Sequence, residues 1–345
     1  FFSLVIMAIC CGLAHQILYW QKTPEKIYDM AYDYMFAVLL GTGATIFYNM
    51  ISNILRALGD SRTPLVFLVF SSLLNIVLDV VFIVPFKMGV AGAAWATVLS
   101  QLLSAILCTV IGVRKFLTLR LKKEDFQNLG SVIKTHMSMG FPMGFQMSVM
   151  CIGQLAMQGA VNALGTEAIA GYTAATKVDQ FSVLMNAAFG IAISNYVAQN
   201  FGAGKQDRIR KVLFQCLAMV TTVGLVMGLG AYFAGTPLLS IYSSDPKVIQ
   251  FGLLRLSVIC TTYCLCGIMD TMVGALRGIG YSFMPMVVSL LGACGLRIVW
   301  IFTIFQWHRS LFTLYISYPV TWIITAFVHM ICYAIVRRKQ LAQYS

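Results

Sequence analysis

Charged residues are scarce in this sequence, since Asp, Glu, Lys and Arg together make up only 10% of its 345 residues. Apolar residues make up 59%, and the mean hydropathy is +0.82. A water-soluble globular domain carries about 25% charged residues, so this composition excludes such a domain. Lipid must therefore be the solvent for most of the surface.

Patterns typical of catalysis and of metal binding are also missing. The ten cysteines include no CxxC pair, the four histidines are scattered singly, and neither HExxH nor GxSxG occurs. The segment 202–205 superficially resembles a phosphate-binding loop, but Gln199 and Gln206 replace the leading Gly and the Ser or Thr that would meet magnesium. We expect a protein that is not an enzyme and has no cofactor, with an intramembrane enzyme as a lesser alternative.

Long apolar runs, in contrast, are abundant. A helix needs roughly 20 predominantly apolar residues to cross the hydrocarbon core of a bilayer. Ten such runs occur, at 1–20, 30–54, 64–84, 89–113, 138–160, 180–201, 212–234, 250–276, 284–306 and 311–336. The expected fold class is an all-α integral membrane protein with ten spanning helices.

The basic residues give a net charge of +12, and they cluster in every second loop, most densely at 114–134, 205–211 and 337–339. By the positive-inside rule these loops are cytoplasmic. We therefore expect a multi-pass protein of the cell membrane with a cytoplasmic C-terminus. The charge indicates topology, and no nucleic acid is expected as a partner, because aromatic stacking platforms are missing from these loops.

One segment of the chain is repeated: Arg56–Pro64 (RALGDSRTP) recurs as Arg277–Pro285 (RGIGYSFMP), and both ends are offset by 277 − 56 = 285 − 64 = 221 residues. Equal offsets place both copies on one side of the membrane, which predicts two pseudo-symmetric lobes in parallel orientation. The expected domains are a four-helix N-lobe at 1–113, a basic linker at 114–136, and a six-helix C-lobe with a short basic tail at 137–345. The unequal lobes predict two further helices upstream of residue 1.

Several segments resemble the multidrug and toxic compound extrusion (MATE) family. In the N-terminal half the resemblance is to the signature of helices four to six, in the same order and spacing, at 56–64, 75–79 and 89–97. In the second half it is to the corresponding loops at 165–172, 199–205 and 275–278. The resemblance implies two six-helix lobes around a central cleft, of which this chain would hold helices three to twelve. It also implies alternating-access export of mostly cationic amphiphilic compounds in exchange for H⁺ or Na⁺.

Asp79 lies within an apolar run, where a carboxylate costs roughly 2.5–3.5 kcal/mol on insertion scales. Asn75 lies one turn earlier on the same helix face. The resemblance implies that Asn75, Asp79 and Thr97 line the ion-coupling pocket of the N-lobe, together with an Asp of the first helix that this chain does not contain. A fourth-helix Asn also belongs to that pocket, and Asn53 or Ser52 is its nearest candidate. We expect H⁺ or Na⁺ at Asp79, with a structural role for this carboxylate as the alternative.

A second carboxylate, Asp270, shares a helix face with Tyr263. Gln146, Met150 and Gln154 follow one another at helical spacing in an earlier run. We expect these five residues to line the substrate cleft, although the resemblance implies a Glu near Met150 in some relatives. Two alternatives stay open: Asp270 pairs with Arg255 or Arg297, and the glutamines bond neighbouring helices.

The remaining expectations concern packing and partners. Lys177 and Asp179, just before the 180–201 run, are expected to be solvated or interfacial. GxxxG pairs are expected to mark close helix packing, and they begin at Gly140, Gly224 and Gly274. The expected partners are small organic cations and the lipid bilayer, and the protein is expected to be a monomer. A lipid-linked oligosaccharide flippase of the same superfamily is the main alternative, since such flippases usually hold pyrophosphate with several Arg and Lys.

Overall fold

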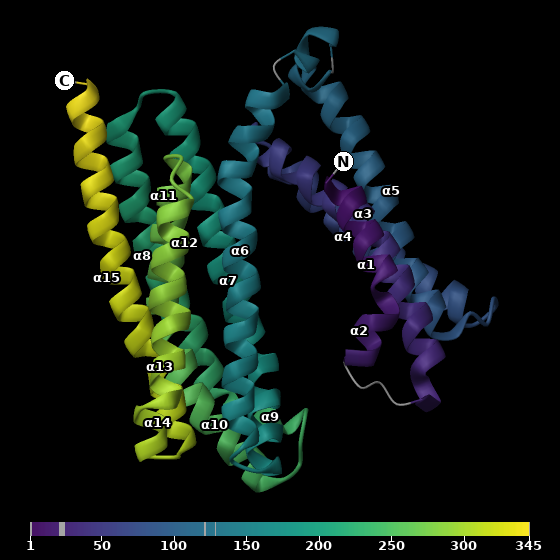
Figure 1. The fold of residues 1–345 in the computed structure, drawn as a ribbon, viewed down its shortest axis with the longest axis vertical. Coiled ribbons are helices and arrows are strands. Elements are labelled where there is room, and N and C mark those ends of the chain that lie inside the picture. The colour runs from purple at the N-terminus through teal and green to yellow at the C-terminus, as the bar shows by residue number, and fades with distance from the viewer. Residues whose placement is uncertain (1, 21–24, 121, 128, 345) are drawn as a thin grey trace. The chain divides into compact units, whose positions relative to one another are not determined.

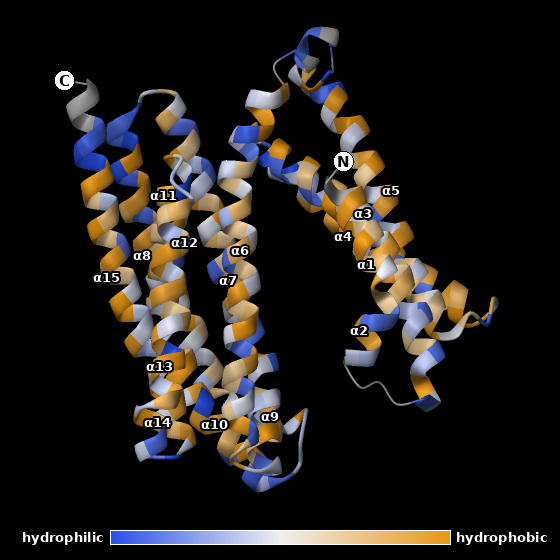
Figure 2. Ribbon diagram, viewed as in Figure 1, coloured by the Kyte–Doolittle hydropathy of each residue, from blue (hydrophilic) through white to orange (hydrophobic). Residues whose placement is uncertain are grey.

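The computed structural model describes residues 2–20, 25–120, 122–127 and 129–344, which form helices and connecting turns with no strand among them (Figure 1). Hydrophobic residues cover most of the length of these helices, and hydrophilic residues gather near several helix ends (Figure 2). The chain divides into two compact units, residues 1–127 and 128–345. The predicted all-α fold class is confirmed.

Unit 1 is built around three long helices that follow two short ones. Its helices are α1 (Phe2–Gly12), α2 (Ala14–Trp20), α3 (Tyr28–Ala57), α4 (Arg62–Ile83) and α5 (Gly89–Lys115), with 3₁₀ turns at Glu25–Ile27, Leu117–Leu119 and Lys123–Phe126. Helix α5 packs against both α3 and α4, and α1 packs against α3. The buried core of the unit is small and centres on Ile51, Leu55 and Cys108.

Unit 2 contains more helices and a larger core. Its helices are α6 (Leu129–Asn162), α7 (Thr166–Gly202), α8 (Gln206–Phe233), α9 (Gly235–Ser240), α10 (Pro246–Ile259), α11 (Tyr263–Gly278), α12 (Phe283–Ser289), α13 (Leu296–Phe302), α14 (Ile304–Trp307) and α15 (Leu311–Tyr344). A 3₁₀ turn (Cys260–Thr262) joins α10 to α11, and a π-helix (Leu290–Gly295) joins α12 to α13. Helix α7 packs against α8, α10 and α11, and α15 packs against α10 and α11.

Eight of the ten predicted spans are long and apolar enough to cross a membrane within the described chain. They are α3, α4, α5, α7, α8, α10 with α11, α12 to α14, and α15. The predicted first span is divided at Leu13 into α1 and α2, each too short to cross. Helix α6 has 34 residues, but its polar residues, including Gln146, Gln154 and Gln158, make it less apolar than the other spans. The protein is a multi-pass membrane protein.

Two predicted boundaries differ from the structure. The division between the units, after Gln127, falls inside the predicted linker, but residues 129–136 are already helical and belong to α6. Helix α7 begins at Thr166 rather than at 180. Small residues explain this early start: Gly171 lies so close to the backbone of α10 that a Cβ there would come within 2.7 Å of the Val248 carbonyl oxygen. Helical packing against α10 therefore extends α7 beyond its most apolar part.

The repeated segment has the same conformation in both units. Gly59 follows α3 with φ = 88°, and Gly280 follows α11 with φ = 97°. In each copy the glycine N–H bonds the carbonyl of the arginine three residues earlier, at 3.0 Å to Arg56 and 2.9 Å to Arg277. Glycine adopts this left-handed conformation without the steric cost of a Cβ. The repeat read from the sequence is thus also a structural repeat.

Candidate functional site

Two of the residues predicted to couple an ion, Asn75 and Thr97, meet between α4 and α5. The side-chain amide of Asn75 donates a hydrogen bond to the Thr97 hydroxyl at 3.3 Å. Thr97 in turn donates its own proton to the carbonyl of Ala93 at 3.0 Å. Small residues of α5, among them Ala94 and Ala96, are fully buried and allow α5 to approach its neighbours closely.

Asp79 lies one turn after Asn75 on the same face of α4. Its Oδ1 atom is buried and has no hydrogen-bond partner. None of the ion pairs found among the described residues involves Asp79. Asp79 thus lies one helical turn from the Asn75–Thr97 pair, with one buried oxygen that no described residue bonds.

Asn53 is not brought to this site. It lies four residues before the end of α3, and Asp79 lies 17 residues after the start of α4, beyond the same turn. At about 1.5 Å of rise per residue, the two differ in level by roughly 20 Å. Asn53 instead accepts a hydrogen bond from Arg56 at 3.0 Å. The nearby Ser52 is buried, with a hydroxyl that has no partner.

A polar pair that the sequence analysis missed lies between α3 and α5. The Thr45 hydroxyl donates to the side-chain oxygen of Gln101, and both residues are half-buried. The only sign of this pair in the sequence was one polar residue in each of two apolar runs. The pairing itself depends on which helix faces meet.

At the end of α3, the repeated turn holds a second carboxylate of unit 1. Asp60 accepts hydrogen bonds from the Thr63 hydroxyl at 2.6 Å and from the Lys115 ammonium at 2.7 Å. Burial by itself would raise the pKa of the Asp60 carboxyl, but the hydrogen bonds from Lys115 and Thr63 outweigh it and hold this pKa well below its ordinary value. Asp60 is thus a permanently charged anchor between the turn and α5.

In unit 2, Asp270 is half-buried on α11 and has no ion-pair partner within 4.0 Å among the described residues. The predicted alternative of a pair with Arg255 or Arg297 is wrong, because Arg255 bonds Asp179 and the Arg297 Nε bonds Thr321. Arg277 lies two turns later on the same helix, α11.

The other predicted cleft residues separate into three environments. Met150 and Gln154 of α6 line a small cavity of about 40 Å³, together with Arg297 and others. Gln146 is 7% exposed and accepts a hydrogen bond from Arg277 at 2.9 Å, so this glutamine bonds a neighbouring helix. Tyr263 is 5% exposed and packs in the core, with its ring 5.5 Å from that of Trp322. The structure does not bring all five residues to one surface.

Asp179 is not solvated, contrary to prediction. It is 2% exposed within α7 and accepts two hydrogen bonds from Arg255 of α10, at 2.9 Å from Nε and 2.5 Å from Nη2. The Arg255 guanidinium also lies over the ring of Tyr172 at 4.4 Å. Lys177 is exposed. The Asp–Arg pair was missed because its members lie 76 residues apart, and only the packing of α7 on α10 joins them.

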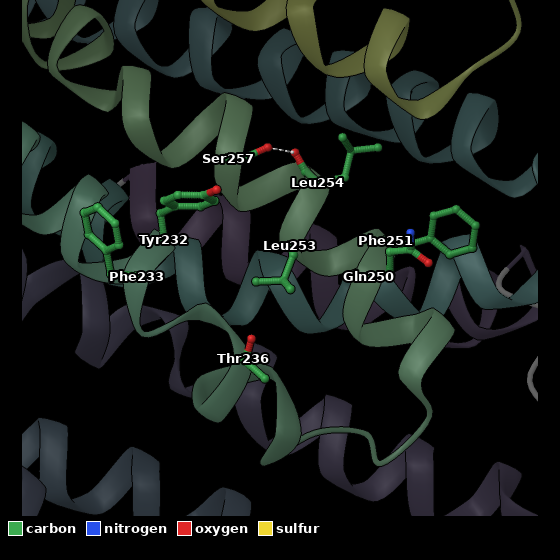
Figure 3. A pocket seen from close by; sticks show the side chains of 8 residues that line it. All are labelled: Tyr232, Phe233, Thr236, Gln250, Phe251, Leu253, Leu254 and Ser257. Carbon is green, nitrogen blue, oxygen red and sulfur yellow. Dashed lines mark hydrogen bonds between the residues drawn. The ribbon is translucent and has the colours of Figure 1, made fainter.

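A further hollow of about 600 Å³ opens beside α8, α9 and α10 (Figure 3). Apolar and aromatic side chains such as Phe233, Leu253 and Leu254 line it, with Thr236, Gln250 and Ser257 as its polar members. The Ser257 hydroxyl is bonded to the Leu254 carbonyl at 2.8 Å. This hollow contains none of the predicted site residues and no charged side chain, so it offers no ion site.

The fold and the unit 1 site together define a class: a helical multi-pass membrane protein with a carboxylate and neutral oxygens placed within its spans. The MatE family model matches residues 1–81 and 142–303 of the chain. The chain therefore belongs to the MatE family, the family that the sequence motifs resemble. Its members are transport proteins and not enzymes.

Relatives and solved structures agree with this assignment. The chain is 30% identical to the probable multidrug resistance protein YpnP of Bacillus subtilis, over 83% of this chain and 64% of that protein. It is 28% identical to the probable multidrug resistance protein NorM of Thermotoga maritima, over 77% and 58% respectively. The crystal structure of the Vibrio cholerae MATE transporter VcmN in the bent form matches with a TM-score of 0.89 at 19% identity, over 98% of this chain and 76% of that one. The chain thus spans less than two thirds of the length of either relative.

Proposed function

We propose that this protein exports small amphiphilic molecules across the cell membrane by alternating access, in exchange for H⁺ or Na⁺. The names of the two relatives as multidrug resistance proteins support export of drug-like compounds. The observation that carries the coupling proposal is the unpaired carboxylate of Asp79, beside the hydrogen-bonded pair of Asn75 and Thr97.

The reason lies in the cost of burying charge. A carboxylate within a span is stable only where a proton, an ion or a fixed cation offsets its desolvation. No fixed cation pairs with Asp79 within the described chain. Neutral oxygens of Asn75 and Thr97 tolerate both an occupied and an empty site, as a cycling carrier requires. In this proposal Asp79 gains and loses H⁺, or is a ligand of Na⁺.

The remaining features of the proposal follow from the sequence. The basic loops favour a cytoplasmic C-terminus, and the transporter acts as a monomer with organic cations as substrates. Asp270, whose carboxylate has no ion-pair partner among the described residues, is the second candidate for binding a cation.

The test replaces Asp79 by Asn in the reconstituted protein and measures dye export under an imposed proton gradient and then under a sodium gradient. The amide keeps the shape of the side chain but does not titrate, so we expect gradient-driven export to be lost while dye binding is retained. Export at the wild-type rate under either gradient would show that coupling lies elsewhere, with Asp270 the next candidate.

Asp207→Asn is the matched control. Asp207 is exposed in the first turn of α8, outside the apolar part of that helix. The same loss of one negative charge at this position should leave export unchanged. A comparable loss in both variants would mean that net charge, and not the Asp79 site, is responsible.

A further inference from the structure

Arg255, Arg277 and Arg297 are buried or half-buried in unit 2, and only Arg255 forms an ion pair with a carboxylate among the described residues. Arg255 is bonded to Asp179, and Arg277 donates a hydrogen bond to the side-chain oxygen of Gln146 at 2.9 Å. Arg297, the third, forms no ion pair within 4.0 Å in the described part of the chain. A guanidinium remains charged at any physiological pH, so Arg297 places in unit 2 a positive charge that no carboxylate of the described residues pairs with.

The side chain of Arg297 is nevertheless held firmly in place. Its Nε donates to the Thr321 hydroxyl at 3.1 Å, and Thr321 donates its own proton to the Tyr318 carbonyl at 3.0 Å. The guanidinium lies 4.0 Å from the centre of the Tyr318 ring and 5.6 Å from that of Trp322. Stacking on rings uses the face of the guanidinium and leaves the N–H groups on its edge free to bond.

One of these edge groups has no partner. The Nη2 atom of Arg297 is buried and makes no hydrogen bond. A buried N–H group without an acceptor costs about 1–3 kcal/mol, and more when the group is charged. Neither the ring stacking nor the bond to Thr321 satisfies it. Arg297 is therefore a preorganised donor that lacks an acceptor.

The space beside Arg297 fits a small acceptor. The cavity of about 40 Å³ lies between α6, the π-helix with α13, and α15, and Met150, Gln154 and Cys294 line it together with Arg297. A cavity needs about 10–15 Å³ measured in this way to hold one water molecule, so this cavity has room for a small polar group. Gln154 is exposed, which leaves the cavity accessible from the surface of unit 2 at α6.

We propose that Arg297 is an oxyanion subsite, which binds the carboxylate of an amphiphilic substrate while the apolar body of that substrate lies along α6. The fork of N–H groups on a guanidinium matches the two oxygens of a carboxylate. The thioethers of Met150 and Met157 supply an adaptable apolar wall beside it. This proposal rests on the export function and extends its substrates from organic cations to zwitterions and anions.

The test measures equilibrium binding of two matched probes to the purified full-length protein in phosphatidylcholine nanodiscs. The probes are a rhodamine dye with a free carboxylate and the methyl ester of the same dye. Arg297→Gln should weaken binding of the free acid by about tenfold or more, as expected for one lost charge-assisted hydrogen bond, and leave binding of the ester unchanged. Arg297→Lys keeps the charge but lacks the fork of N–H groups, so its affinity for the free acid should lie between those of the wild-type protein and Arg297→Gln.

Arg309→Gln is the control, because Arg309 is exposed and bonded to Gln306. It should not change the ratio of the two affinities, and thermal unfolding of each variant verifies the fold. If Arg297→Gln weakens both probes equally, or neither, the subsite is wrong while export stands. If the wild-type protein binds neither dye, the export proposal fails for such compounds and the subsite with it.

A second set of measurements tests whether the group bound at Arg297 belongs to the substrate or to a lipid headgroup. Repeating the measurement in nanodiscs that contain phosphatidylglycerol should leave the free-acid affinity unchanged, because the subsite takes a substrate group. An Arg297-dependent loss of dye binding in these discs would overturn that assignment and identify the headgroup of an anionic lipid as the occupant.

Discussion

Two intramembrane carboxylates, one in each unit, have opposite surroundings. Asp179 of unit 2 is 2% exposed and bonded twice to Arg255, whose guanidinium lies over aromatic rings. Asp79 of unit 1 has a buried oxygen without a partner and lies near the Asn75–Thr97 pair. The first carboxylate is held in an ion pair, whereas no described residue bonds the buried Oδ1 of the second. The difference separates a structural charge from a candidate switch.

The two units also differ in the size of their buried cores. Unit 2 has two buried clusters, and the larger one includes Leu256, Ile259, Leu314 and Tyr315. Unit 1 has a cluster of only three buried residues. Its helix α4, which carries Asp79, presents most of its surface outside the core of unit 1.

The largest expected effect comes from breaking the fixed pair. Replacing Arg255 by Leu leaves Asp179 as a buried charge without a partner, and we expect a loss of about 3–5 kcal/mol in the free energy of unfolding. The double variant Asp179→Leu with Arg255→Leu should recover most of that loss, because neither charge remains. Unfolding of the purified protein in detergent measures both. Equal stability of the single and double variants would show that the ion pair is not what holds α7 to α10.

A smaller effect is expected from the close packing within unit 2. A methyl group on Gly228 of α8 would overlap the carbonyl oxygen of Cys260, so Gly228→Ala should destabilise the protein by about 1–3 kcal/mol. Gly140 of α6 belongs to the same kind of GxxxG pair, but nothing lies within 4 Å of a Cβ at that position. Gly140→Ala is therefore the matched control and should be neutral. If both changes cost the same, the motif acts through helix propensity and not through packing.

The smallest expected effect on stability comes from substitutions at equivalent positions in the two copies of the repeated turn. Asp60 also accepts the backbone N–H of Thr63 at 3.1 Å, in the manner of a helix cap, and its counterpart Tyr281 is 39% exposed. Asp60→Ala should cost about 1–2 kcal/mol at neutral pH, and Tyr281→Ala should cost less. Unfolding measurements on both variants test this difference.

The pH dependence of the Asp60 variant has a definite sign. The pKa of Asp60 is lowered in the folded protein, so its stabilisation is complete above the unfolded pKa of about 4 and is lost as the pH falls through the folded pKa. The gap in stability between wild-type protein and Asp60→Ala should therefore be constant near neutral pH and shrink below about pH 4. A gap that grows on acidification would show that another group dominates.

The sequence alone determined the class, the repeat and the shared helix face of Asn75 and Asp79. Composition and the length of apolar runs decide whether a chain is membrane-embedded, because the cost of placing polar groups in lipid outweighs other preferences. The repeated turn was visible because its glycines are needed for a positive φ. Asn75 and Asp79 were predictable as neighbours because they lie one helical turn apart.

Contacts between helices were decided only by the tertiary structure. Asp179 was expected at a solvated helix end, yet it is buried against Arg255, and Asn53 was expected beside Asp79, yet it lies at another level of unit 1. The unpaired Arg297 and its small cavity were likewise invisible in the sequence. Helical periodicity fixes which residues share one face, but the rotation and depth of each helix against its neighbours depend on packing over the whole unit. For that reason the sequence shows which charged residues lie within the spans, but it does not predict which residues they contact.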